Sequence, residues 1–255
     1  MLAEPITSTV YMPLIMNNYC IPAKREGLYL FLDDADVQRI RYAVATNPET
    51  QLAWSHVQQD VNGYLNNFPT TYDPDDGWNV TWAGGGHYWP RDIALAYLVT
   101  GEDRYADGTR RILNLVISNT DVGGMYGDEL FIQPKHGPVT YQALLFAYMA
   151  LRNTTWLTNQ QRAQYDDFFI REAAALLAYT QFPPEPLTPQ NAWNWWISAD
   201  TAIATMSVAF RGNAAADNLY QPAVDRLARR LTGWWLWRIC GQLLSNDDGR
   251  AGHFC

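Results

Sequence analysis

The sequence predicts an all-α protein built from stacked helical hairpins. Apolar residues recur at helical spacing along most of the chain from Leu30 onward, and the alternation typical of strands is almost absent. The predicted helices come in pairs with short connections, whereas long polar segments rich in Pro and Gly recur at 68–88, 120–138 and 182–193. This layout is typical of a helix bundle or an (α/α) toroid, whose long loops line one face.

The first helix pair is predicted from its ends. Asp33 and Asp34 are suitable N-cap residues, and Asn47-Pro48 ends the first helical pattern. A second helix is predicted over 49–66. Its apolar side is expected to contain Leu52, Val57, Val61, Tyr64 and Leu65.

The second pair follows the first long loop. Pro90 suits the first turn of a helix over 89–99, which Thr100-Gly101 closes. Glu102 or Asp103 then starts the next helix. Its apolar face is expected to contain Tyr105, Ile112, Leu113 and Val116.

The remaining helices are predicted at 139–151, at 159–180, from the Trp-rich segment to about Phe210, and at about 217–239. After them the chain ends at Cys255 in a turn, with no closing helix and with too few helices for a closed toroid. We therefore expect an incomplete toroid domain over 30–255, truncated at its C-terminus. Residues 1–29 are expected to be a tail or a leader remnant.

Composition excludes some functions and leaves others open. The net charge of −8 argues against a nucleic-acid-binding surface, which requires a basic patch. No apolar run approaches the roughly 20 residues that a membrane span requires. The three cysteines lie far apart and in no metal-ligand spacing, so neither a disulfide pattern nor a metal site nor a cofactor is predicted. The oligomeric state is not predicted either.

Aromatic residues are abundant, at 14% of the chain, and three tryptophans gather in 190–200 beside two asparagines. A flat indole ring suits either a sugar ring or a helical core. Consecutive tryptophans cannot all face one way, so at least one of them is expected in the core. Asn191 and Asn194 are good helix N-cap residues, so helix capping is the alternative to substrate binding for each of them.

Two short motifs resemble those of polysaccharide lyases with an (α/α)-toroid domain. Asn194-Trp195-Trp196, followed by an apolar helix, resembles the Asn-Trp-Trp element of chondroitin and hyaluronate lyases. Asn191 corresponds to an asparagine of the Asn-Asn-His element of alginate lyases, although Ala192 and Trp193 stand at the following positions. About sixty residues later, 247–253 resembles the Asp-Gly-…-His turn that delivers their catalytic histidine, here His253.

A third segment, 91–106, resembles a sequence motif common in these lyases. In this motif, an apolar helix ends in Thr-Gly-Glu, and a Tyr-Ala pair opens the next helix. The family places a catalytic tyrosine and a catalytic arginine beyond the histidine. In this sequence, both of these residues would fall after Cys255. The resemblance implies secretion or a periplasmic location, although the N-terminus lacks the basic region of a signal peptide.

The resemblance implies cleavage of a uronate-containing, acidic polysaccharide by β-elimination. In this reaction, an amide must offset the charge of the uronate carboxylate while a base removes the proton at C5. Asn194 or Asn191 would be the amide and His253 the base. Trp195 and Trp196 would be stacking platforms.

Further residues are candidates for binding the sugar chain. His87 and Tyr88 follow three glycines, whose backbone can approach a ligand closely. The others are Arg91, Tyr126, His136 and Arg250, which are also common types of surface or loop residue.

Two other functions remain open. A glycoside hydrolase of the same fold requires two carboxyl groups flanking the scissile bond. Asp200, on the Trp-rich helix, is the most interesting of its candidates, which also include Asp73, Asp75, Asp76 and Asp247. A non-catalytic helical module that binds carbohydrate through its aromatic face is the third possibility.

Overall fold

The computed structural model describes residues 30–68, 89–119, 137–179 and 194–245, of which the side chains of 137–139, 194–196 and 232–245 are left undescribed. The regular elements of these ranges are helices, and the predicted all-α class is confirmed. They are α1 (Asp34–Thr46), α2 (Pro48–Asn66), α4 (Trp89–Thr100), α5 (Asp103–Asn119), α6 (Gly137–Leu151), α7 (Asn159–Tyr179), α8 (Asn194–Ala209) and α9 (Ala214–Ser245).

Local capping defines the ends of α1 and α2, as predicted. The Asp33 carboxylate accepts a hydrogen bond from the backbone N–H of Asp36 at 2.8 Å. The Asp36 carboxylate accepts one in return from the N–H of Asp33 at 2.9 Å, which completes a capping box. Asn47 ends α1 and also caps α2, where its side-chain oxygen accepts from the N–H of Thr50.

Replacing Asp33 with alanine is expected to destabilise the protein by about 1 kcal/mol, because the backbone N–H of Asp36, in the first turn of α1, loses its side-chain acceptor. Urea unfolding followed by circular dichroism measures the change. The matched control is Gln38→Ala, an exposed position of the same helix, which should change stability by less than about 0.5 kcal/mol. Equal effects of the two substitutions would contradict a capping role for Asp33.

One part of the predicted α2 face is wrong. Leu52 is 63% exposed, whereas Trp54, Val61 and Tyr64 are buried. Leu52 precedes Val61 by nine residues, which is about two and a half turns of an α-helix and places the two side chains on opposite sides. Trp54, about two turns before Val61, occupies the core-facing position instead.

The second pair forms as predicted. Gly101, with φ of +72°, provides the left-handed residue that ends α4, and α5 begins two residues later. The predicted apolar face of α5 is confirmed, since all of its members are at most 1% exposed: Tyr105, Ile112, Leu113 and Val116.

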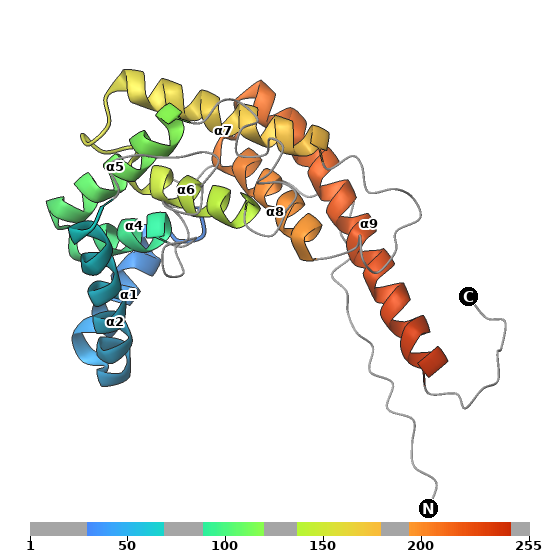
Figure 1. Ribbon diagram of the computed structural model, residues 1–255, viewed down its shortest axis with the longest axis horizontal. Helices are drawn as coiled ribbons and strands as arrows, with labels where there is room; N and C mark the ends of the chain where they lie inside the picture. The colour runs from blue at the N-terminus through green and yellow to red at the C-terminus, as the bar shows by residue number, and fades with distance from the viewer. Residues whose placement is uncertain (1–29, 69–88, 120–136, 180–193, 246–255) are drawn as a thin grey trace, which may run out of the picture.

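Helix α6 lies at the centre of the fold. It contacts α4 on one side and α8 on the other, so that α4, α6 and α8 form a row (Figure 1). Helix α5 packs on α4 and α6, and α7 and α9 pack on α8 and on each other. Every residue of α6 from Ala143 to Leu151 is buried, as expected for a helix that is apolar on all sides.

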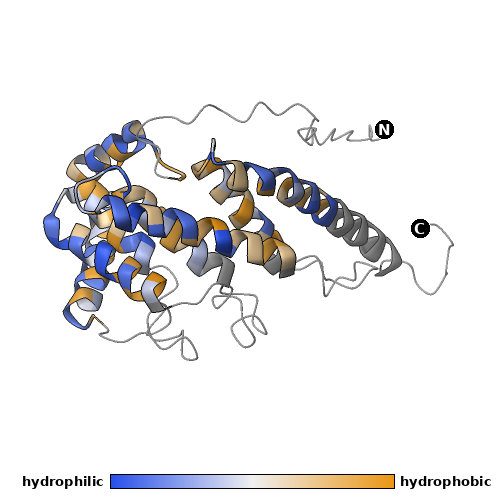
Figure 2. Cartoon of the chain, turned by 90° about the horizontal axis from the view of Figure 1, so that it is seen from above, coloured by the Kyte–Doolittle hydropathy of each residue, from blue (hydrophilic) through white to orange (hydrophobic). Residues whose placement is uncertain are grey.

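Two helices exceed their predicted lengths. Helix α6 begins at Gly137, two residues before the predicted start. Helix α9 runs from Ala214 to Ser245, well beyond the predicted 217–239, and contains Pro222. Its described part carries hydrophilic residues along much of its length (Figure 2), which suits a helix at the edge of the fold.

Candidate functional site

The residues to which the family resemblance assigns the reaction lie at or beyond the limits of the described ranges. Asn194 is the first residue of α8, and Trp195 and Trp196 follow it in the same helix; the directions of these three side chains are not described. The other predicted site residues outside the described ranges are Asn191, His253, His87, Tyr88, Tyr126, His136 and Arg250.

Helices α6 and α8 run in the same direction. Near their beginnings, the Gln142 amide donates to the carbonyl oxygen of Ser198 at 3.3 Å. Near their ends, Met149 and Ala209 line the same pocket. Asn194, the first residue of α8, therefore lies on the side of the row where the N-terminal end of α6 also lies. Since the N-terminal end of a helix carries a partial positive charge, two such ends face the same side.

Arg91 lies in the first turn of α4 and is the predicted sugar-binding arginine that the structure describes. Its side chain is 46% exposed and pairs with Asp92 at 2.9 Å. Burial raises the pKa of the Asp92 carboxyl, and the Arg91 guanidinium opposes this effect. Arg91 is accessible to solvent at the start of α4, although part of its charge is offset by Asp92.

An aromatic stack at the start of α4 was missed by the sequence-based prediction. The Trp89 and Tyr64 rings stack with centroids 4.7 Å apart, and Phe68 meets Tyr64 edge-on at 5.6 Å. Within the described part of the chain, the buried Nε1–H of Trp89 has no hydrogen-bond partner. Residues 64 and 89 belong to different helices, and no local pattern indicates that they meet.

Asp200 forms the most buried charge cluster in the described part of the chain. Its side chain is fully buried on α8, and its two oxygens lie 2.7 Å from Arg226 and 2.7 Å from Arg230 of α9. The two arginines are four residues apart and share one face of α9. Arg226 also donates to the carbonyl oxygen of Leu177 at 2.8 Å. The cluster therefore connects α7, α8 and α9.

The charges of this cluster oppose the effects of burial. Burial raises the pKa of the Asp200 carboxyl, and Arg226 and Arg230 counteract that rise. Burial also lowers the pKa of Arg226, which Asp200 opposes. The carboxylate and the two guanidinium groups each need the opposite charge nearby to stay ionised while buried. Because there are two guanidinium groups and one carboxylate, the cluster retains one excess positive charge.

This arrangement corrects the reading of Asp200 as a hydrolase carboxyl. A catalytic carboxyl must reach the scissile bond, whereas Asp200 has no exposed surface and both of its oxygens are paired with arginine. Its role in the described structure is to join helices. Asp73, Asp75, Asp76 and Asp247 lie outside the described residues.

Among the described residues, no group of His, Cys, Asp and Glu is arranged to hold a metal ion. None of the described helices is long and apolar enough to cross a membrane. The chain matches no family model, no curated protein and no solved structure.

Proposed function

We propose that the chain is the helical domain of a polysaccharide lyase that cleaves a uronate-containing polymer by β-elimination. The observation that supports this proposal most is the position of Asn194. It begins α8, on the side of the row where the N-terminal end of α6 also lies. An amide there would have two positive helix ends beside it, which favours the approach of an anionic sugar.

In this mechanism Asn194 donates a hydrogen bond to the uronate carboxylate, with Asn191 as the alternative donor. Offsetting the carboxylate charge makes the C5 proton more acidic and stabilises the enediolate that develops as it leaves. His253 accepts that proton. The C4–O bond then breaks, and the electron pair left at C5 forms the C4–C5 double bond of one product. The departing oxygen takes up a proton, from protonated His253 or from water, and becomes a hydroxyl group of the other product.

We further propose that the row of α4, α6 and α8 is the inner layer of an (α/α) toroid and that α5, α7 and α9 belong to its outer layer. The packing of each outer helix against the row supports this arrangement. In such a toroid, the aromatic rings of Trp195 and Trp196 would be available for stacking on sugar rings.

The activity is tested by incubating the full chain with alginate, chondroitin and hyaluronate in separate reactions. Because elimination creates a conjugated C4–C5 double bond, we expect near-ultraviolet absorbance to rise with one of the three polymers. Release of reducing ends without this chromophore would indicate hydrolysis and contradict the proposal. Binding without any product would instead support the non-catalytic carbohydrate-binding module.

A further inference from the structure

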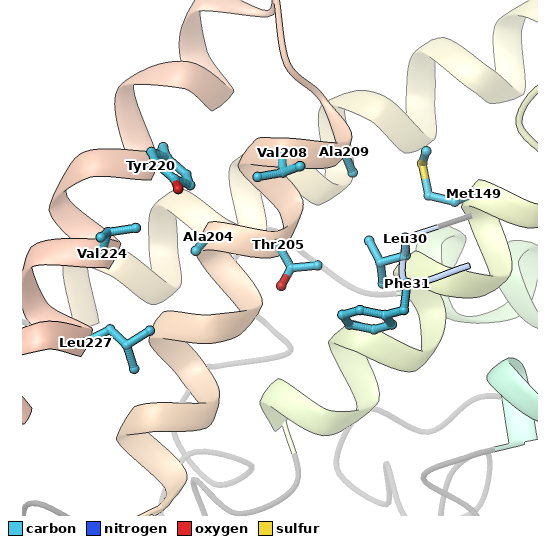
Figure 3. Close-up of a pocket in the computed structure, with 10 residues that line it drawn as sticks. All are labelled: Leu30, Phe31, Met149, Ala204, Thr205, Val208, Ala209, Tyr220, Val224 and Leu227. Atoms are coloured by element: carbon cyan, nitrogen blue, oxygen red, sulfur yellow. The ribbon is translucent and has the colours of Figure 1, made fainter. Parts of the chain in front are cut away.

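An apolar pocket of about 360 Å³ lies between the first described residues and helices α6, α8 and α9 (Figure 3). Leu30 and Phe31 form one side, and Met149 of α6 contributes to the wall. None of the lining side chains is charged. The volume is within the range of roughly 300–1,000 Å³ that is typical of ligand pockets, so the pocket suits a few apolar side chains.

The other wall consists of two facing helix surfaces. Ala204 and Val208 lie one turn apart on α8, while Tyr220, Val224 and Leu227 recur at helical spacing on α9. All the described lining residues belong to these two helices, to α6 or to the pair Leu30 and Phe31. Phe31, at the edge of the pocket, is 59% exposed, so part of the apolar lining is accessible to solvent.

We propose that the apolar run 10–16 of this same chain binds in this pocket. The run reads Val-Tyr-Met-Pro-Leu-Ile-Met and lies outside the described residues. It is uncharged, like the pocket lining, and it is the longest such run before Leu30. The chain that carries it enters the described fold at Leu30, on the pocket wall itself.

The length of the connection permits this docking. Residues 17–29 separate the run from Leu30, and a connection of this length can span up to roughly 40 Å when extended. Binding within one chain also has the advantage of a high effective concentration over binding a second molecule. Pro13 disfavours a helix through the run, so the run would enter the pocket in an extended form.

Hydrogen exchange of the full chain, followed by mass spectrometry of peptides, tests this docking. We expect the amides of 10–16 to exchange roughly tenfold or more slowly than in the variant Thr205→Arg, whose new charge occupies the pocket. The variant Leu14→Asp should lose the same protection. Ser8→Asp, an equal change of charge outside the run, should keep it.

Three results would overturn the proposal. The amides of 10–16 exchange in the wild type as fast as in a free peptide, or Thr205→Arg leaves their protection unchanged. In the third, the protection of 10–16 falls when the protein is diluted, and sedimentation shows a dimer that dissociates over the same concentrations. The pocket would then bind a second copy of the chain. If Thr205→Arg fails to fold, Ala204→Phe, which fills the half-buried site with an apolar ring, replaces it and should release the run equally.

Discussion

Replacing Asp200 with asparagine is expected to destabilise the protein by about 3–5 kcal/mol, because it leaves Arg226 and Arg230 buried without their counter-charge. Both guanidinium groups lie 2.7 Å from the Asp200 carboxylate, and asparagine, which has nearly the same shape, removes the negative charge without creating a cavity. The change should appear as a lower urea midpoint with an unaltered slope, since the surface exposed on unfolding stays the same.

Two further variants distinguish the buried cluster from a general effect of acidic residues. Asp225→Asn changes an exposed carboxylate of α9 that bonds Gln221, and it should cost less than about 0.5 kcal/mol. The combined replacement Asp200→Leu, Arg226→Met and Arg230→Leu should recover most of the lost stability, because it removes every charge of this cluster. A loss below about 1 kcal/mol for Asp200→Asn would show that water reaches the cluster and screens its charges.

Replacing Asn194 with alanine is expected to lower the turnover of the uronate polymer by a factor of roughly 10²–10³, which is typical of removing one donor to a developing anion. Initial rates of near-ultraviolet absorbance at saturating polymer measure kcat. The interaction strengthens as negative charge develops at the carboxylate, so kcat should fall more than KM rises.

The control for Asn194 is another asparagine at a helix start. Asn213 precedes α9, and its side chain accepts from the backbone N–H of Ala215 at 3.0 Å, at the opposite end of α8. Asn213→Ala should cost about 1 kcal/mol of stability and leave kcat unchanged. If Asn194→Ala behaves in the same way, Asn194 is a helix cap and the proposed mechanism loses its amide.

The helix boundaries were predictable because they depend on neighbours in sequence. Asp33 and Asp36 are three residues apart, and Asn47 with Pro48 ends one helix and begins the next within two residues. The left-handed Gly101 is equally local. The extension of α9 beyond residue 239 was missed, although Asn246 and Gly249 follow its actual end and are typical of residues that terminate a helix.

Contacts between helices could not be predicted from the sequence. Asp200 and Arg230 are thirty residues apart, and their pairing depends on which face of α9 packs against α8. The same reason applies to the stack of Trp89 on Tyr64. For the candidate site, the structure confirms the helix predicted from the Trp-rich segment to about Phe210 and begins it at Asn194. The roles assigned to Asn194 and His253 stay predictions.

The order of the helices has a consequence for biosynthesis. The helix pairs that pack most closely are near neighbours in the chain, such as α4 with α5 and α6, and α8 with α7 and α9. A fold dominated by such local contacts has low contact order and forms rapidly. Each hairpin can therefore pack onto the preceding ones as it leaves the ribosome, before the final helix has been synthesised.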